Sequence, residues 1–227
     1  MRYLTVLILS LIPLTTLASS KINYLYVGGD AGIFLASMNQ NYQDQVDIIA
    51  NNIAQPINQN GYTAGIRAGY VYTFQSIYSL GAELSGNYDT QNASFKSGAA
   101  SSAFSDTTKI QYHIDMTIVP GINLSDSILG YMKLGMSFAS ISDQLTSPAG
   151  FFATYTTYNS HWNGLGFAAG LGVSKVLTSR LSIFTEANYH DYGSIDFDDF
   201  QNFSADYTHT AHIYSYDVVM GVTYKIV

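Results

Sequence analysis

The chain has 227 residues, of which only 11% are charged and 14% are aromatic, and its formal net charge is −7 without any cysteine. The negative charge and the lack of a Lys and Arg cluster argue against nucleic-acid binding, because phosphate contacts need grouped cations. The absence of cysteine excludes a disulfide framework and thiolate chemistry. Beyond residue 20 no apolar run approaches the about 18 residues of a spanning helix, which argues against a helical membrane protein.

Residues 1–20 are organised like a secretory signal peptide. Arg2 supplies a positive start, an apolar run extends from Leu4 to Leu14, and small residues surround Ala18 and Ser20. We therefore expect export, cleavage near residue 18 or 20, and a single mature domain of residues 21–227. The alternative, an N-terminal anchor helix, is disfavoured because the apolar run is too short to span a membrane comfortably.

The mature chain alternates between apolar residues and small or polar residues, which is the period of a strand with two different faces. The segment from Tyr62 to Phe74 is the clearest, since its only charge, Arg67, falls on the face opposite the tyrosines. In a later segment, Ile110 is predicted to share the apolar face with Tyr112 and Ile118. In chain order, the expected strands are residues 24–35, 62–74, 78–88, 109–118, 128–141, 162–176, 181–192 and 214–226.

Eight strands joined by alternating short and long connections predict an all-β fold, an eight-stranded antiparallel transmembrane β-barrel with short periplasmic turns and long extracellular loops. The short links are expected at residues 74–77, 123–127 and 177–180. The long links are expected at residues 37–61, 89–107, 142–161 and 193–211.

Alternation alone also suits a soluble lipocalin-like barrel with an apolar interior. Three features favour the membrane, one of which is the signal peptide together with the regular alternation of long and short connections. Tyrosines stand at both ends of several strands on the apolar face, as interfacial girdles require. The other face is mostly Gly, Ser, Thr and Ala with isolated charges, which suits the filling of a narrow lumen better than a solvated surface.

Several segments resemble the OmpA-type and opacity-type outer-membrane barrels of Gram-negative bacteria across essentially the whole mature chain. The resemblance rests on Tyr26 to Gly32, Gly69-Tyr70, Leu80 to Glu83, Gly170 to Val173, Leu181 to Gly193 and Gly221 to Ile226. It implies residence in the cell outer membrane, contact with lipid and lipopolysaccharide, and assembly by the barrel-assembly machinery through the C-terminal strand. An aromatic residue usually closes such barrels, whereas here Ile226 takes that place and Val227 follows.

With the apolar face toward lipid, seven charged residues point into the lumen and must be paired or hydrated. In related barrels such residues form a plug of salt bridges, and the short turn after Phe74 places Arg67 roughly opposite Glu83 as the first candidate pair. The alternative is a small cation-preferring channel, because acids outnumber bases among the seven. The predicted lumen charge network is Asp30, Arg67, Glu83, Asp115, Lys133, Glu186 and Asp217.

We expect no enzymatic activity, no cofactor and no metal site from the sequence. Some outer-membrane barrels are lipid A deacylases, but His190 and Glu186 would stand about 13 Å apart on one strand, so a catalytic set with Ser194 is disfavoured. A metal pair of His209 and His212 is disfavoured because nothing fixes the two residues together. The remaining histidines are His113 and His161.

The long outer loops are rich in polar and aromatic residues, which leaves two interpretations open. They bind a host molecule or another surface ligand, or they only cap the barrel beneath lipopolysaccharide. The stretch from Gly193 to Tyr207 is acidic and is either a solvated loop or a calcium bridge to lipopolysaccharide phosphates. Its acidic residues are Asp196, Asp198, Asp199 and Asp206.

Overall fold

The computed structural model describes residues 23–44, 53–74, 77–91, 95–97, 104–147, 156–197 and 207–226. The predicted signal peptide therefore lies outside the described residues. Every regular element in the described part of the chain is a β-strand. In chain order the strands are β1 (Tyr24–Asp44), β2 (Ile53–Phe74), β3 (Tyr78–Gln91), β4 (Phe95–Ser97), β5 (Phe104–Ser125), β6 (Ile128–Ser147), β7 (Thr156–Val176), β8 (Leu181–Phe197) and β9 (Tyr207–Lys225).

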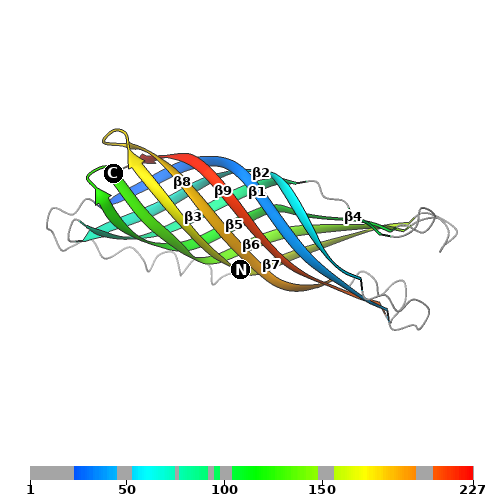
Figure 1. Cartoon of the computed structure of the whole chain (residues 1–227). Helices are drawn as coiled ribbons and strands as arrows, with labels where there is room; N and C mark the ends of the chain where they lie inside the picture. The colour runs from blue at the N-terminus through cyan, green and yellow to red at the C-terminus, as the bar shows by residue number, and fades with distance from the viewer. Residues whose placement is uncertain are drawn as a thin grey trace, which may run out of the picture.

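The strands form one closed antiparallel barrel (Figure 1). Each long strand pairs with its chain neighbours, and β1 also pairs with β9, so the first and last strands meet. On the other side β3 pairs with β5. The short β4 pairs only with β5, beyond the end of β3, and therefore continues the β3 position rather than adding a ninth one. The predicted eight-stranded antiparallel barrel is confirmed.

Short turns close one end of the barrel. Hydrogen bonds join the backbones there: the amide of Val176 donates to the carbonyl of Ser127, and the amide of Lys225 donates to the carbonyl of Arg180, both at 2.8 Å. In Figure 1 the turn between β7 and β8 and the C-terminus lie together at this end, whereas β4 lies at the opposite end. We call the two ends the short-turn end and the outer end.

The strands reach further toward the outer end than the sequence pattern indicated. The long links were predicted to begin at Ser37, Asp89, Ser142 and Gly193, but β1 continues to Asp44 and β6 to Ser147. Those predicted boundaries are wrong because backbone pairing continues where apolar alternation fades: β1 and β2 remain paired as far as Tyr42 and Ile53. Residues 45–52, 98–103, 148–155 and 198–206 connect the strands and lie outside the described residues.

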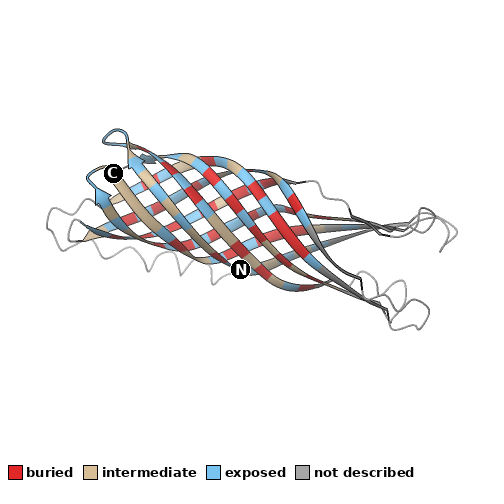
Figure 2. Cartoon of the chain, viewed as in Figure 1, coloured by how far each residue is buried: buried red, intermediate tan, exposed pale blue. Residues whose placement is uncertain are grey.

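Exposed residues alternate with buried or partly buried ones along the long strands (Figure 2). The exposed positions form an apolar band, including Ile66 at 75% exposure and Met220 at 71%. Exposed tyrosines border the band, with Tyr62 and Tyr88 toward the outer end and Tyr78 toward the short-turn end. This distribution matches the predicted faces and the predicted tyrosine girdles. The described residues contain no helix long and apolar enough to cross a membrane.

Two β-bulges change which face a residue occupies. The register between β5 and β6 shifts between Ile110 and Tyr112, so Ile110 is fully buried in the lumen while Tyr112 is exposed. The prediction that Ile110 lies on the outward face is therefore wrong, because a bulge inserts one residue and reverses the alternation. In β8 the register shifts between Asp191 and Ser194, and Gly193 there has a φ of 70°, which glycine adopts most readily.

The outer part of the lumen contains an apolar cluster that the sequence analysis did not predict. Its members are buried and come from β1, β5, β6, β8 and β9, and Trp162 of β7 packs against them. We call this cluster the apolar layer, and it consists of Phe34, Ala36, Met38, Ile110, Ala139, Ile141, Tyr192, Ile195, Ala211 and Ile213.

Candidate functional site

Charged side chains fill the lumen below the apolar layer in two separate groups. All seven residues of the predicted lumen network are buried, each with 9% exposure or less. The group nearer the short-turn end is the charge layer, made of Asp30, Arg67, Glu83, Lys133 and Glu186. The next group is the histidine layer, made of Asp89, His113, Asp115, His190 and Asp217.

Arg67 is the centre of the charge layer. Its Nε and Nη2 both donate to Asp30 Oδ2, at 3.0 and 2.8 Å, and its Nη1 donates to Glu186 Oε1 at 2.6 Å. The guanidinium also lies over the ring of Phe184, 4.0 Å from its centroid, a cation–π contact. These contacts use all three guanidinium nitrogens, and the planar, multiply donating guanidinium is what makes arginine suited to buried ion pairs.

The predicted pair of Arg67 and Glu83 is present but is the longest of these contacts, at 3.5 Å. Glu83 lies closer to Lys133, with 2.7 Å between Nζ and Oε1, and Lys133 also contacts Glu186 Oε2 at 3.3 Å. The pairing differs from the prediction because Asp30 on the neighbouring strand β1 and Glu186 on β8, across the lumen, also reach Arg67, and turn length reveals neither contact. Two cations thus face three carboxylates in this layer.

Two tyrosines complete the hydrogen bonding of the charge layer. Tyr26 Oη donates to Glu83 Oε2 at 2.5 Å, and Tyr131 Oη donates to Glu186 Oε1 at 2.7 Å. Both rings lie over glycines: a Cβ at Gly69 would stand 2.5 Å from the Tyr26 ring, and one at Gly172 would stand 2.4 Å from the Tyr131 ring. Inward-facing glycines therefore make room for the tyrosines that satisfy the acids.

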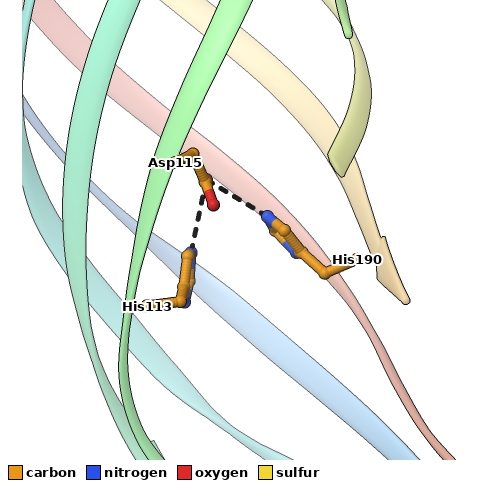
Figure 3. A group of neighbouring side chains, drawn as sticks. All are labelled: His113, Asp115 and His190. Carbon is orange, nitrogen blue, oxygen red and sulfur yellow. Dashed lines mark hydrogen bonds and ion pairs between the residues drawn. The ribbon is translucent and has the colours of Figure 1, made fainter. Parts of the chain in front are cut away.

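The histidine layer places two imidazoles on either side of one carboxylate. His190 Nε2 lies 3.2 Å from Asp115 Oδ2, and His113 Nε2 lies 3.7 Å from the same oxygen. The ring centroids are 4.6 Å apart. His113 and Asp115 come from β5 and His190 comes from β8, so the group joins opposite walls of the barrel (Figure 3).

Each imidazole also faces a second carboxylate through its other nitrogen. His113 Nδ1 lies 2.8 Å from Asp89 Oδ2, and His190 Nδ1 lies 3.6 Å from Asp217 Oδ2. Asn188 donates to Asp217 Oδ1 at 2.8 Å. Sequence reasoning placed Asp115 and Asp217 in the lumen but missed Asp89, His113 and His190 as partners. The signal that could have found His113 and Asp89 is parity, because both lie on the polar face of their strands.

The catalytic set of Glu186, His190 and Ser194 that the sequence analysis disfavoured does not come together in the structure. His190 and Glu186 are buried in the lumen in different layers, whereas Ser194 is exposed on the outside. Ser194 Oγ instead lies 3.5 Å from His212 Nδ1, and His212 Nε2 lies 3.4 Å from Asp191 Oδ1. The side chains of His209 and the acidic residues from Asp196 to Asp206 lie outside the described residues, so the predicted calcium bridge stays a prediction.

The Ser194 group sits at the edge of the apolar band. Asp191 accepts hydrogen bonds from the backbone amide of Gly193 at 2.9 Å and from the hydroxyl of Tyr189 at 3.1 Å. Tyr189 belongs to an outward aromatic cluster with Tyr214 and Tyr216, whose centroids lie 6.5 and 5.0 Å from its own. Such tyrosines mark a membrane–water interface.

Comparison with known proteins identifies the relatives of this barrel. A family model described as outer membrane protein beta-barrel domain matches residues 4–224. A protein of Coxiella burnetii is 30% identical over 220 residues, which cover 87% of this chain and 82% of that one.

Two solved structures have similar folds. The outer-membrane protease OmpT of Escherichia coli has a TM-score of 0.56 at 10% identity, with 93% of this chain and 99% of that chain covered. Neisserial surface protein A has a TM-score of 0.46 at 14% identity, with 89% and 97% covered. At these identities the structural likeness concerns the fold alone.

Proposed function

The chain belongs to the family of outer-membrane protein β-barrel domains, and from that premise we propose that it is a closed barrel of the cell outer membrane whose outer end serves as a surface-interaction platform. The single observation that carries the proposal is the extension of paired strands beyond the apolar band, with a packed apolar layer inside them.

The extension lifts the outer end away from the membrane. On β1 the last strongly exposed aliphatic residue of the band is Leu35, and the strand continues for nine residues, from Ala36 to Asp44. At about 3.3 Å per residue and a tilt of about 45°, that length rises about 20 Å. A projection of this height suits a protein that presents its connecting segments to a ligand. A barrel whose loops only cap it would not require such an extension of the strands.

The filling of the lumen supports a closed barrel rather than a channel. The charge layer joins β1, β2, β3, β6 and β8 by ion pairs, the histidine layer joins β3, β5, β8 and β9, and the apolar layer lies above both. An eight-stranded barrel has only enough interior for side chains. An ion would have to cross packed apolar groups such as Phe34 and Ile213, both of which have 0% exposure.

Conductance tests the closed lumen. We expect the refolded mature protein to be silent in a planar bilayer, and Arg67→Ala to be silent too, because the apolar layer remains. Reproducible cation-selective openings of the wild type would instead support the channel. Openings seen only in Arg67→Ala would mean that the charge layer alone blocks the path.

Adhesion tests the surface role. Escherichia coli cells that carry the protein in their outer membrane should bind cultured epithelial cells severalfold better than cells with an empty vector. Replacing residues 45–52 and 148–155 by Gly-Ser linkers of equal length should remove the gain, while the barrel remains folded. Binding at the vector level, or binding that survives both replacements, would contradict the interaction role and leave a structural one.

We also propose two general partners for the barrel. Lipid and lipopolysaccharide would cover the apolar band, and the barrel-assembly machinery would recognise β9, whose last residues pair with β1 and β8. Truncation of the final strand at Gly221 should prevent insertion into the outer membrane of cells. Normal insertion of that variant would contradict recognition through β9.

A second candidate function, hydrolysis of acyl esters at the membrane surface, rests on the Ser194, His212 and Asp191 contacts. In such a reaction Ser194 Oγ attacks the acyl carbonyl, His212 takes its proton and returns it to the leaving alcohol, and water then releases the acid. A fluorogenic long-chain acyl ester presented in detergent micelles tests it. Turnover that Ser194→Ala and His212→Ala abolish, and that His161→Ala leaves unchanged, would support the candidate. Absence of turnover by the wild type would end it.

A further inference from the structure

The histidine layer has the arrangement of a metal site. Three ligand atoms, one from each of His113, Asp115 and His190, lie within 4.8 Å of one another, and all three residues are buried. We propose that these residues bind one divalent transition-metal ion of the zinc type inside the barrel, where it ties β5 to β8. The metal would be a structural brace and is independent of the proposed surface role.

The two separations that involve Asp115 are close to those around such an ion, and all three ligand atoms lie within 4.8 Å of one another. Zinc bonds nitrogen and oxygen ligands at about 2.0–2.2 Å, so neighbouring ligands of a tetrahedral zinc stand about 3.3–3.6 Å apart. The two imidazole Nε2 atoms lie 3.2 and 3.7 Å from Asp115 Oδ2, on either side of that range. In Figure 3 both rings point at the Asp115 carboxylate from their own strands. Two imidazoles and one carboxylate are a donor set that suits zinc and related ions rather than magnesium or calcium.

The surrounding carboxylates supply the outer contacts that such sites use. A metal-bound histidine usually directs its other ring nitrogen at a carboxylate or carbonyl, which fixes the tautomer and orients the ring. His113 Nδ1 lies 2.8 Å from Asp89 Oδ2, whereas His190 Nδ1 lies 3.4 Å from the Ser215 hydroxyl and 3.6 Å from Asp217 Oδ2. In both imidazoles Nε2 is therefore the nitrogen that faces Asp115. Neither outer aspartate comes from the strand that carries its histidine, because Asp89 is on β3 and Asp217 is on β9.

Each of the three carboxylates in the histidine layer leaves one oxygen unsatisfied. Asp89 Oδ1, Asp115 Oδ1 and Asp217 Oδ2 are buried and have no hydrogen-bond partner. With neutral imidazoles the three carboxylates give the layer a charge of −3, which is costly to bury. The cations Arg67 and Lys133 pair with Asp30, Glu83 and Glu186 in the charge layer instead. A divalent ion would neutralise most of this charge.

The experiment measures metal retained by the folded barrel. The mature protein is refolded into lipid vesicles with zinc, freed of loose metal by chelator and gel filtration, and analysed by mass spectrometry for bound zinc. We expect about one zinc per wild-type barrel, at least tenfold less in His113→Gln and His190→Gln, and an intermediate loss in Asp89→Asn. The control His161→Gln changes an exposed histidine on β7 and should retain the wild-type amount.

Folding is monitored separately, by the gel-mobility shift of unheated barrels, so that a variant that does not fold is not counted as a loss of binding. If His190→Gln does not fold, cobalt replaces zinc in the wild type, and its visible absorption spectrum must report a four-coordinate site with nitrogen ligands. Three results would overturn the proposal. The wild-type barrel retains no zinc, or His113→Gln and His190→Gln both retain it, or His161→Gln loses it. If the wild-type barrel retains no zinc, the histidine layer is instead a protonated, hydrogen-bonded cluster.

Discussion

Arg67 Nη1 donates a hydrogen bond of 2.6 Å to Glu186 Oε1, although the two residues are 119 positions apart in the sequence. They lie on β2 and β8, which are separated by β1 and β9 in the barrel, so the bond crosses the lumen. Lys133 on β6 reaches the other oxygen of Glu186 at 3.3 Å. Glu186 is therefore bound by cations from two other strands, β2 and β6. Ion pairs inside the lumen thus stabilise the barrel in addition to the backbone hydrogen bonds between strands.

Removing the central cation should destabilise the barrel strongly. Arg67→Met leaves Asp30 and Glu186 buried with one fewer cation, and breaking a buried pair in this way costs about 3–5 kcal/mol. Urea unfolding in lipid vesicles measures the free energy. The matched control is Lys175→Met, which removes a cation from an exposed position and should change stability by about 0.5 kcal/mol or less. Equal stability of the two variants would show that the charge layer does not hold the barrel together.

The apolar layer should contribute stability through packing. Phe34 has 0% exposure and its ring centroid lies 6.4 Å from that of His113, so it joins the apolar layer to the histidine layer. Phe34→Ala should cost about 3–5 kcal/mol because it leaves a cavity. Phe34→Leu keeps most of the volume and should cost less than about 1.5 kcal/mol. The same urea experiment compares the two, and similar losses would mean that the layer is loosely packed.

Two glycines on neighbouring strands should tolerate an added methyl group to different extents. A Cβ at Gly69 meets the buried Tyr26 ring at 2.5 Å, so Gly69→Ala must displace the tyrosine that donates to Glu83, at a cost of about 1–3 kcal/mol. At Gly86 the nearest atom to a Cβ is 4.0 Å away, and Gly86→Ala should change stability by about 0.5 kcal/mol or less. Thermal unfolding of both variants is the measurement. A neutral Gly69→Ala would show that Tyr26 is free to move.

Local alternation predicted the barrel because successive residues of a strand between lipid and lumen must alternate between apolar side chains facing lipid and polar or small side chains facing the lumen. That rule places Arg67, Glu83 and Asp217 in the lumen without any knowledge of their partners. It fails at Ile110 and beyond Leu35. A bulge reverses the faces at the first position, and above the membrane band the lumen becomes apolar while the outside becomes polar.

Partners across the lumen could not be predicted from the sequence. Backbone register assigns each residue only to its two strand neighbours, whereas Arg67 contacts Glu186 and His190 contacts Asp115 across strands that do not pair. Such contacts depend on the tilt and stagger of the closed barrel. His113 and His190 therefore appeared as unrelated residues until closure brought their rings to 4.6 Å.

A pair of arginine substitutions should locate the membrane on the barrel. Met116 lies near the middle of the outward band on β5 at 63% exposure, and it is paired with Met136. Met116→Arg places a charge at the bilayer midplane and should cost about 2–4 kcal/mol in lipid vesicles. Asn39 is also exposed, but it lies above the band on β1, so Asn39→Arg should be nearly neutral there. Both free energies come from urea unfolding in the same vesicles. A neutral Met116→Arg would place the band outside the hydrocarbon core, and a costly Asn39→Arg would mean that the membrane also covers the outer extension.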